Sequence, residues 1–307
     1  MKFSTRSAAS LLLVSTITAH PVEKRQAAVT DLDILQYALT LEHLENVFYK
    51  KAISTMPESM FLAAGFSSAY YNNLLYVAMD EEQHVQLLSS SIAGAGATPV
   101  AACTYDFPFT DPKSFVGLAS ILEGVGTSAY LGGAGLITSK EYLGVAGSIL
   151  VTESIHTSLQ RFNLGQIAPA NAYGTALGLN DVYTMAAAFI VSCPASNPPL
   201  PVKAFPALKA VQGQPTMQGI SFTFMAAGAV PATFFVTFVS GLNITSVAGT
   251  MSGDTITATI PNTIAGQSYA FITNAATNMS VTDDMVLFGP TVVEVTPPSP
   301  YFNISQQ

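Results

Sequence analysis

The sequence predicts a mainly α protein, in which a four-helix bundle is followed by a C-terminal β-sandwich-like domain. Residues 31–192 contain long segments with helical periodicity. Residues 205–296 contain short alternating runs, rich in Thr, Val, Phe, Ser and Gly, that Gly, Pro and Asn interrupt. Such runs are typical of an antiparallel sandwich. The length of 307 residues is enough for two ordinary domains.

The first residues have the order of an export signal. Basic residues precede a short apolar run, residues 8–18, which is followed by the small residue Ala19. The run is too short to span a bilayer. We therefore expect a signal peptide over 1–19 and a short pro-segment over 20–25, which ends at the dibasic pair Lys24-Arg25. The alternative is an ordinary buried N-terminal helix.

The chain is acidic, with a formal net charge of −8. Removal of residues 1–25, which contain four basic residues and one acid, would change this charge to −11. An acidic chain is a poor partner for nucleic acid, and no basic run suggests an anionic membrane surface. We expect a secreted protein, extracellular or associated with the cell wall, without a nucleic-acid partner or a membrane span. The oligomeric state is not predicted.

Two cysteines and three glycosylation sequons agree with this compartment. An even cysteine count in an exported chain favours one disulfide, Cys103–Cys193. The alternative is two unrelated buried thiols. The sequons begin at Asn243, Asn278 and Asn303.

The helical half should contain four long helices, at about 31–53, 67–94, 112–137 and 140–164. Asp111-Pro112 is a good helix start, because Asp caps the helix and proline suits its first turn. A shorter helix is expected near 180–191. The loop from about 94 to 110 is long enough to cross the bundle between the second and third helices.

The change of period sets the expected domain boundaries. We expect the bundle over 26–196, a linker with three prolines over 197–204 and the β-rich domain over 205–307. The apolar stretch 219–239 raises the alternative of a membrane span. Pro231 and the regularly spaced Ser and Thr residues favour two strands and a turn instead.

Two of the predicted helices carry the same pair of ligand-type residues. Glu81 and His84 lie on the second helix, and Glu153 and His156 lie on the fourth. Residues three apart share a helix face. Both pairs fall within the apolar seam that should face the core of the bundle.

The other two helices each place one carboxylate in their apolar seams, Glu42 and Glu123. A tyrosine follows seven residues after each of them, Tyr49 and Tyr130. The first two helices therefore resemble the last two as a degenerate internal repeat. We interpret both tyrosines as packed aromatic side chains of the bundle. The alternative is a role beside the ligands, as hydrogen-bond donors or redox relays.

Four buried carboxylates need compensating positive charge. Between residues 30 and 165 the sequence has few basic residues, and most lie near predicted helix ends: Lys50, Lys51, Lys113, Lys140 and Arg161. Two divalent ions would balance the four glutamates, and imidazoles would complete a shell that suits iron or manganese. One Glu from each of two helices and Glu-x-x-His from each of the others is the di-metal carboxylate arrangement. The alternative is buried polar pairs without metal.

Other polar residues near these motifs are weaker candidates. Glu45 lies one turn after Glu42 and could bind metal or form a hydrogen bond to a ligand. His43 should lie at the surface or between helices. Glu82 and Asp80 are expected to be solvated. The pattern assigns no catalytic residue.

The chain resembles the secreted fungal ferritin-like proteins described as stress-response or late-development proteins, which are similar to plant desiccation-related proteins. The resemblance rests on DLDILQYALTLEHLE from residue 31, CTYDFP from residue 103, LEGVGTSAYLG from residue 122 and ESIH from residue 153. It covers most of the mature chain. It implies a ferritin-like fold with the metal ligands Glu42, Glu81, His84, Glu123, Glu153 and His156. One departure is Ile155, where the family usually has a basic residue.

The motifs and the resemblance together predict a secreted di-metal carboxylate protein that handles O2 or peroxide in stress protection. Its reaction would be ferroxidase-like or manganese-catalase-like. Ferritin-like bundles also host inert roles, so the fold does not decide whether the chain is an enzyme. The alternative is a non-catalytic extracellular or cell-surface protein with a structural or vestigial metal site. Its β-rich domain would then make the interaction.

Overall fold

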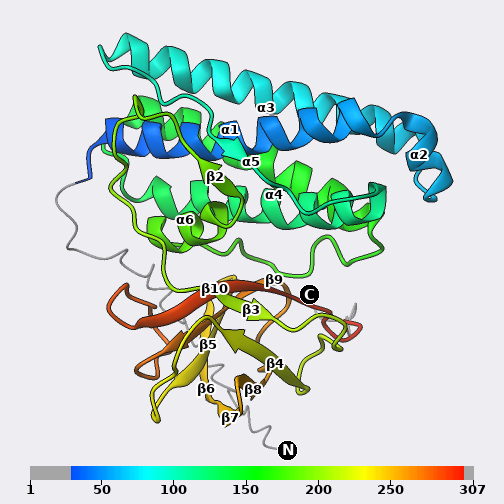
Figure 1. The fold of residues 1–307 in the computed structure, drawn as a ribbon, viewed down its shortest axis with the longest axis vertical. Helices are drawn as coiled ribbons and strands as arrows, with labels where there is room; N and C mark the ends of the chain where they lie inside the picture. The colour runs from blue at the N-terminus through cyan, green and yellow to red at the C-terminus, as the bar shows by residue number, and fades with distance from the viewer. Residues whose placement is uncertain (1–28, 301–307) are drawn as a thin grey trace, which may run out of the picture.

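The computed structural model describes residues 29–300. The expected signal peptide, the expected pro-segment and the sequon at Asn303 lie outside these residues. Figure 1 shows a layer of long helices above a smaller domain of strands. The predicted fold class, a helical bundle followed by a strand-rich domain, is confirmed.

Four long helices form the bundle, and α1 packs along α3 while α4 packs along α5. Their bounds are α1 Asp31–Thr55, α3 Ser68–Gly94, α4 Pro112–Ala134 and α5 Lys140–Asn163. The helix start predicted at Asp111 is present. The Asp111 carboxylate accepts hydrogen bonds from the backbone N–H groups of Lys113 and Ser114, at 2.8 and 3.0 Å.

Two short elements differ from the prediction. A helix that the sequence pattern missed, α2 (Glu58–Ala63), lies between α1 and α3. The helix expected near 180–191 is α6 (Leu179–Ala187). It ends early because the chain then enters strand β2 (Ile190–Ser192), which pairs antiparallel with β1 (Thr104–Tyr105) of the crossover loop. This long-range pairing competes with helix continuation and leaves no local signal.

The predicted disulfide closes this small ribbon. Cys103 immediately precedes β1 and Cys193 immediately follows β2, so antiparallel pairing brings the two residues together. Their sulfurs are bonded across a sequence separation of 90 residues. The bond therefore fixes the crossover loop to the segment that follows the helical domain.

The C-terminal domain contains two four-stranded antiparallel sheets, ordered β10-β9-β5-β6 and β3-β4-β8-β7. Hydrophobic residues from both sheets form a common core between them. The strands are β3 Leu208–Ala210, β4 Ser221–Ala226, β5 Phe235–Ser240, β6 Asn243–Ala248, β7 Thr250–Ser252, β8 Thr255–Thr259, β9 Gly266–Thr273 and β10 Val286–Val295.

Two apolar segments within residues 29–300, the stretch 219–239 and helix α4, form part of the fold. The stretch 219–239 forms β4, a connection and most of β5. Among the helices of residues 29–300, α4 is the one that is long and apolar enough to cross a membrane by length and composition. However, 72% of its apolar window is buried inside the fold, as expected for the core helix of a bundle.

The central strands of the first sheet, β5 and β9, are buried on both faces, because this sheet also packs against the helical domain. In β9, Tyr269 and Phe271 belong to the core that includes α1, α4 and α6. Ala270 and Ile272 alternate with them and belong to the core between the two sheets. The change of period in the sequence predicts a separate β domain. The structure gives this domain its own core and, in addition, a core shared with the bundle.

A buried ion pair joins the two domains. The Arg161 guanidinium on α5 donates to both carboxylate oxygens of Glu294 on β10, at 2.5 and 2.7 Å. Arg161 is 3% exposed and also donates to the Ile167 carbonyl at 2.9 Å. Burial raises the pKa of Glu294 in spite of the attraction of Arg161. Loss of either partner would leave a poorly solvated charge at the interface.

We predict that Arg161→Met destabilises the protein by about 3 kcal/mol, because it leaves Glu294 without its partner. This loss corresponds to a decrease in melting temperature of roughly 5 °C for a chain of this size. Differential scanning calorimetry measures it. Lys140→Met removes an exposed cation from the same helix and is the control. Equal effects of the two substitutions would show that the ion pair does not stabilise the interface.

Candidate metal centre

All four long helices contribute to one cluster in the bundle core. The structure brings together the six residues that the sequence pattern selected as ligands: Glu42 of α1, Glu81 and His84 of α3, Glu123 of α4, and Glu153 and His156 of α5. All six are buried, and the four glutamates are 0% exposed. The apolar seams position them, because each lies on the inward face of its helix.

The six side chains form two overlapping groups. One consists of Glu42, Glu81, His84 and Glu153, and the other of Glu81, Glu123, Glu153 and His156. Within each group, one potential ligand atom of every residue lies within 4.8 Å of all the others. Glu81 and Glu153 belong to both groups. The cluster therefore consists of two adjacent half-sites, which share two carboxylates and are each completed by one further glutamate and one histidine.

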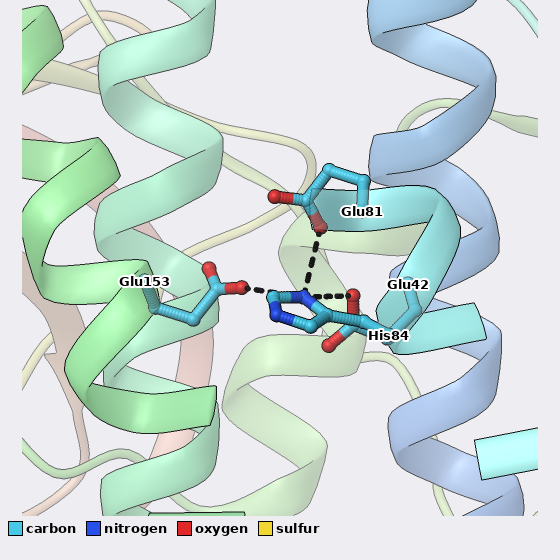
Figure 2. A group of neighbouring side chains, drawn as sticks. All are labelled: Glu42, Glu81, His84 and Glu153. Carbon is cyan, nitrogen blue, oxygen red and sulfur yellow. Dashed lines mark hydrogen bonds and ion pairs between the residues drawn. The ribbon is translucent and has the colours of Figure 1, made fainter. Parts of the chain in front are cut away.

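The first half-site surrounds His84 (Figure 2). Its Nδ1 atom lies 3.2 Å from Glu42 Oε2, 3.4 Å from Glu81 Oε2 and 3.5 Å from Glu153 Oε1. These carboxylates come from α1, α3 and α5, so three helices meet at one imidazole nitrogen. We call this group the His84 half-site.

The second half-site surrounds His156. Its Nδ1 atom lies 3.0 Å from Glu81 Oε1 and 3.3 Å from Glu123 Oε2. Its other nitrogen, Nε2, lies 3.2 Å from Asp80 Oδ2. A carboxylate at this position fixes the ring and directs the opposite nitrogen toward a metal. Asp80 is partly exposed and belongs to neither group of potential ligands, as expected, but its contact with His156 was not anticipated. Its contact is with another helix, which the spacing along α3 cannot reveal.

Most atoms of the cluster approach one another without forming hydrogen bonds. Among residues 29–300, eight buried side-chain N or O atoms lack a hydrogen-bond partner, and six of these belong to the cluster. The six atoms are both oxygens of Glu81, both oxygens of Glu153, Glu123 Oε2 and His156 Nδ1. Unpaired buried polar atoms are costly. Their convergence from three helices, with oxygen and nitrogen donors, is compatible with a metal site.

Two tyrosines hold the outer oxygens of the terminal glutamates. Tyr49 of α1 donates a hydrogen bond to Glu123 Oε1, and Tyr130 of α4 donates one to Glu42 Oε1. The other oxygen of each glutamate faces a histidine: Glu42 Oε2 faces His84, and Glu123 Oε2 faces His156. The interpretation as packed aromatics was therefore incomplete, since both side chains are buried and also hydrogen-bonded to the cluster. The Glu-x6-Tyr repeat was the signal for this role.

A second layer of hydrogen bonds was not anticipated from the sequence. Gln160, one turn after His156 on α5, donates from Nε2 to the Tyr49 hydroxyl at 3.0 Å. Its Oε1 atom accepts a hydrogen bond from Tyr70. Gln160 is 0% exposed. A continuous chain of buried groups thus runs from Tyr70 to the Glu123 carboxylate.

Glu45 adds a fifth buried carboxylate but belongs to neither half-site. It packs beside Glu153 against the bare backbone of Gly126 in α4. A Cβ atom at Gly126 would lie 2.5 Å from Glu153 Oε2 and 3.0 Å from Glu45 Oε1. Glycine is therefore required at this helix position so that both carboxylates fit.

The remaining candidates lie away from the cluster. The half-buried His43 ring contacts the Val100 carbonyl, with Nε2 at 3.0 Å from the oxygen. Glu82 forms an exposed ion pair with Lys50 at 3.2 Å. These positions agree with the interhelical and solvated roles expected for His43 and Glu82.

The pKa values of four groups in the cluster are raised, by burial for two glutamates and by adjacent carboxylates for the two histidines. Burial raises the pKa of Glu153 well above its usual value and that of Glu81 to about 7. Burial alone would lower the pKa of the histidines, but the adjacent carboxylates outweigh it. They raise the pKa of His84 to about 10 and that of His156 to about 11. Metal binding must therefore displace protons from the cluster.

Comparison with known proteins agrees with this geometry. Residues 30–166 match the family described as "Ferritin-like domain". The helical domain is a ferritin-like domain. "Protein rds1" of Schizosaccharomyces pombe (strain 972 / ATCC 24843) is 27% identical over 186 residues, which are 59% of this chain and 44% of that protein. The chain thus spans less than half the length of this relative.

A solved structure is similar to part of this chain at a greater distance. It is a conserved hypothetical protein, rv2844, from Mycobacterium tuberculosis. The two chains are 16% identical with a TM-score of 0.37, and the match covers 46% of this chain and 96% of that one.

We predict that the metal-free ferritin-like domain loses stability as pH rises. Glu81, Glu153, His84 and His156 all have raised pKa values in the fold, so protons bind more tightly to the folded state. For Glu81 this stabilisation is complete below pH 4.5 and is lost as pH rises through about 7. The stabilisation that comes from protonated His84 and His156 is lost at higher pH, toward about 10 for His84.

Urea unfolding at about pH 5.5 and about pH 8.5 measures this dependence through the free energy of unfolding. The metal-free protein should be less stable at the higher pH. With saturating Mn²⁺ the order should reverse, because protons then compete less with the ion for the same ligands. Greater stability of the metal-free protein at the higher pH would contradict the assigned proton binding.

Proposed function

We propose that this chain is a secreted ferritin-like protein that binds two divalent ions, iron or manganese, and reacts with O2 or peroxide in stress protection. The supporting observation is the convergence of six unpaired buried ligand atoms on one space between the helices. Four carboxylates in that space balance the charge of two divalent ions. Such a balance permits ions to be buried in an apolar bundle.

The ligands divide into shared and terminal positions. Glu81 and Glu153 would be available to both ions, since both belong to both half-sites. Glu42 and His84 would complete one ion's coordination, and Glu123 and His156 would complete the other's. Bound iron or manganese would supply redox electrons and a coordination position for the oxidant.

The surrounding residues position these ligands. Tyr49 and Tyr130 hold the terminal carboxylates through hydrogen bonds to their outer oxygens. Asp80 accepts a hydrogen bond from His156 Nε2, so that Nδ1 is free to bind an ion. Because the whole cluster is buried, bulk water is excluded from the ligands.

Two features support export of the protein. The bonded Cys103–Cys193 pair suits an oxidising compartment, where disulfides persist. The sequon residues Asn243 and Asn278 are exposed, as glycosylation requires.

A second candidate is a non-catalytic surface protein in which metal only stabilises the bundle. Large apolar side chains on the solvent face of α5 favour it: Val151, Ile155 and Phe162 are 60%, 62% and 75% exposed. Apolar residues gathered on one helix face mark protein contact sites. Redox cycling of the bound metal would support the first candidate, and a metal that never changes oxidation state would support the second.

We predict that Glu81→Gln and Glu153→Gln each weaken metal binding at least about tenfold, because each removes a shared anionic ligand without changing size. Metal analysis of natively purified protein and calorimetric titration with Mn²⁺ measure the stoichiometry and the affinity. Any consumption of O2 or peroxide should be lost together with the metal.

Glu82→Gln is the matched control for both variants. It changes the net charge by the same amount, but Glu82 lies on the exposed face of α3 and pairs with Lys50. A general electrostatic effect would weaken binding equally in all three variants. Unchanged metal content in the Glu81 and Glu153 variants would refute the di-metal proposal.

A further inference from the structure

A cavity lies between the four long helices, one turn away from the metal cluster. Its volume is about 40 Å³, and the cavity is only partly enclosed. Residues from α1, α3, α4 and α5 line it, and almost all are apolar. The sequence does not predict this cavity, because the lining residues fit an ordinary bundle core.

The inner end of this cavity is lined by residues that flank the His84 half-site, although none of its four potential ligands lines the cavity. Leu41 adjoins Glu42, Leu88 lies one turn after His84, and Ile149 lies one turn before Glu153. Tyr130 also lines the cavity, and its hydroxyl donates to Glu42. A molecule in the cavity would therefore lie against the residues that support this half-site.

The cavity offers little to water. The Tyr130 hydroxyl already donates to Glu42, and the Tyr37 hydroxyl donates to the Leu179 carbonyl at 3.2 Å. Ser91 donates to the Leu87 carbonyl at 2.9 Å, so that among the described residues Tyr142 has the one lining hydroxyl without a hydrogen bond. A buried water needs two to four polar partners, and cavities without them stay dry or hold apolar molecules. The lining thus favours an apolar occupant.

The size limits what that occupant can be. A single water molecule needs about 10–15 Å³ of cavity volume. A cavity of about 40 Å³ therefore holds a molecule of only a few atoms. A diatomic gas fits, whereas a long alkyl chain would have to separate the helices.

We propose that this cavity is the access route by which dioxygen reaches the His84 half-site, so that O2 rather than hydrogen peroxide is the oxidant of the metal centre. Dioxygen is small and apolar and enters a dry cavity without loss of hydrogen bonds. Hydrogen peroxide would lose its hydrogen bonds to water on the same route, which is unfavourable. This inference rests on the proposed function and assigns its substrate.

Two glycines of α4 provide a matched pair of variants. Gly133 lines the cavity, and a Cβ atom there meets no atom within 4 Å. Gly117 lies on the same helix outside the cavity, and a Cβ atom there also meets no atom within 4 Å. Gly133→Val should therefore fill the cavity without a clash at Cβ. Gly117→Val carries the same change of helix propensity and leaves the cavity open.

The first experiment needs no metal. Xenon binding to the metal-free protein is measured by ¹²⁹Xe NMR, since xenon is an apolar probe of dry cavities. The wild type and Gly117→Val should bind xenon, and Gly133→Val should lose this binding. Absence of xenon from the wild-type cavity, or displacement of xenon by decanoate, would overturn the access route for a diatomic gas.

The second experiment compares oxidants on protein loaded with ferrous iron. Two Fe²⁺ ions each lose one electron, and O2 takes up these two electrons and two protons to form hydrogen peroxide. Oxidation by O2 should be at least several-fold slower in Gly133→Val than in Gly117→Val, and oxidation by added peroxide should be equal in the two. Equal slowing of both reactions, or of neither, would overturn the selection of O2. Failure of the wild type to bind metal would instead overturn the proposed function. The xenon measurement is made on metal-free protein, so its outcome does not depend on metal binding.

Discussion

The burial of several carboxylates in one small volume is the constraint on which the helical domain depends. Glu42, Glu81, Glu123 and Glu153 are 0% exposed, and their mutual repulsion would oppose folding unless protons or cations neutralise them. The neighbouring structure follows from this requirement. Tyrosine hydroxyls satisfy the outer oxygens, and helix α4 has a bare position at Gly126 where the carboxylates need room.

The chain's own cations do not meet this requirement. Among the lysines and arginines of residues 29–300, Arg161 alone is buried. Its guanidinium pairs with Glu294 and so joins α5 to the β domain. The β domain therefore stabilises the bundle through an ion pair and a shared apolar core, while the carboxylate cluster is left to bind other cations. The division of roles explains why the described β domain supplies no residue to either half-site.

The sequence predicted the features that depend on local periodicity. Helical repeats located the four long helices, and the two Glu-x-x-His pairs lay in the apolar seams, so their inward direction followed from helix geometry. The contacts of Asp80 with His156 and of Gln160 with Tyr49 and Tyr70 could not be predicted, because they depend on the register between helices. The double burial of β9 was missed for a similar reason: packing of one domain on another leaves no periodic signal.

The di-metal centre is tested most directly by anomalous X-ray diffraction from crystals of natively purified protein, with data on both sides of the iron and manganese absorption edges. The account predicts two anomalous peaks in each chain, both between Glu81 and Glu153, with His84 Nδ1 beside one and His156 Nδ1 beside the other. Two results would contradict it. One is peaks only at the protein surface, and the other is no peak in a cluster whose side chains keep the positions described above. The buried carboxylates would then be neutralised by protons, and the bundle would have a structural role.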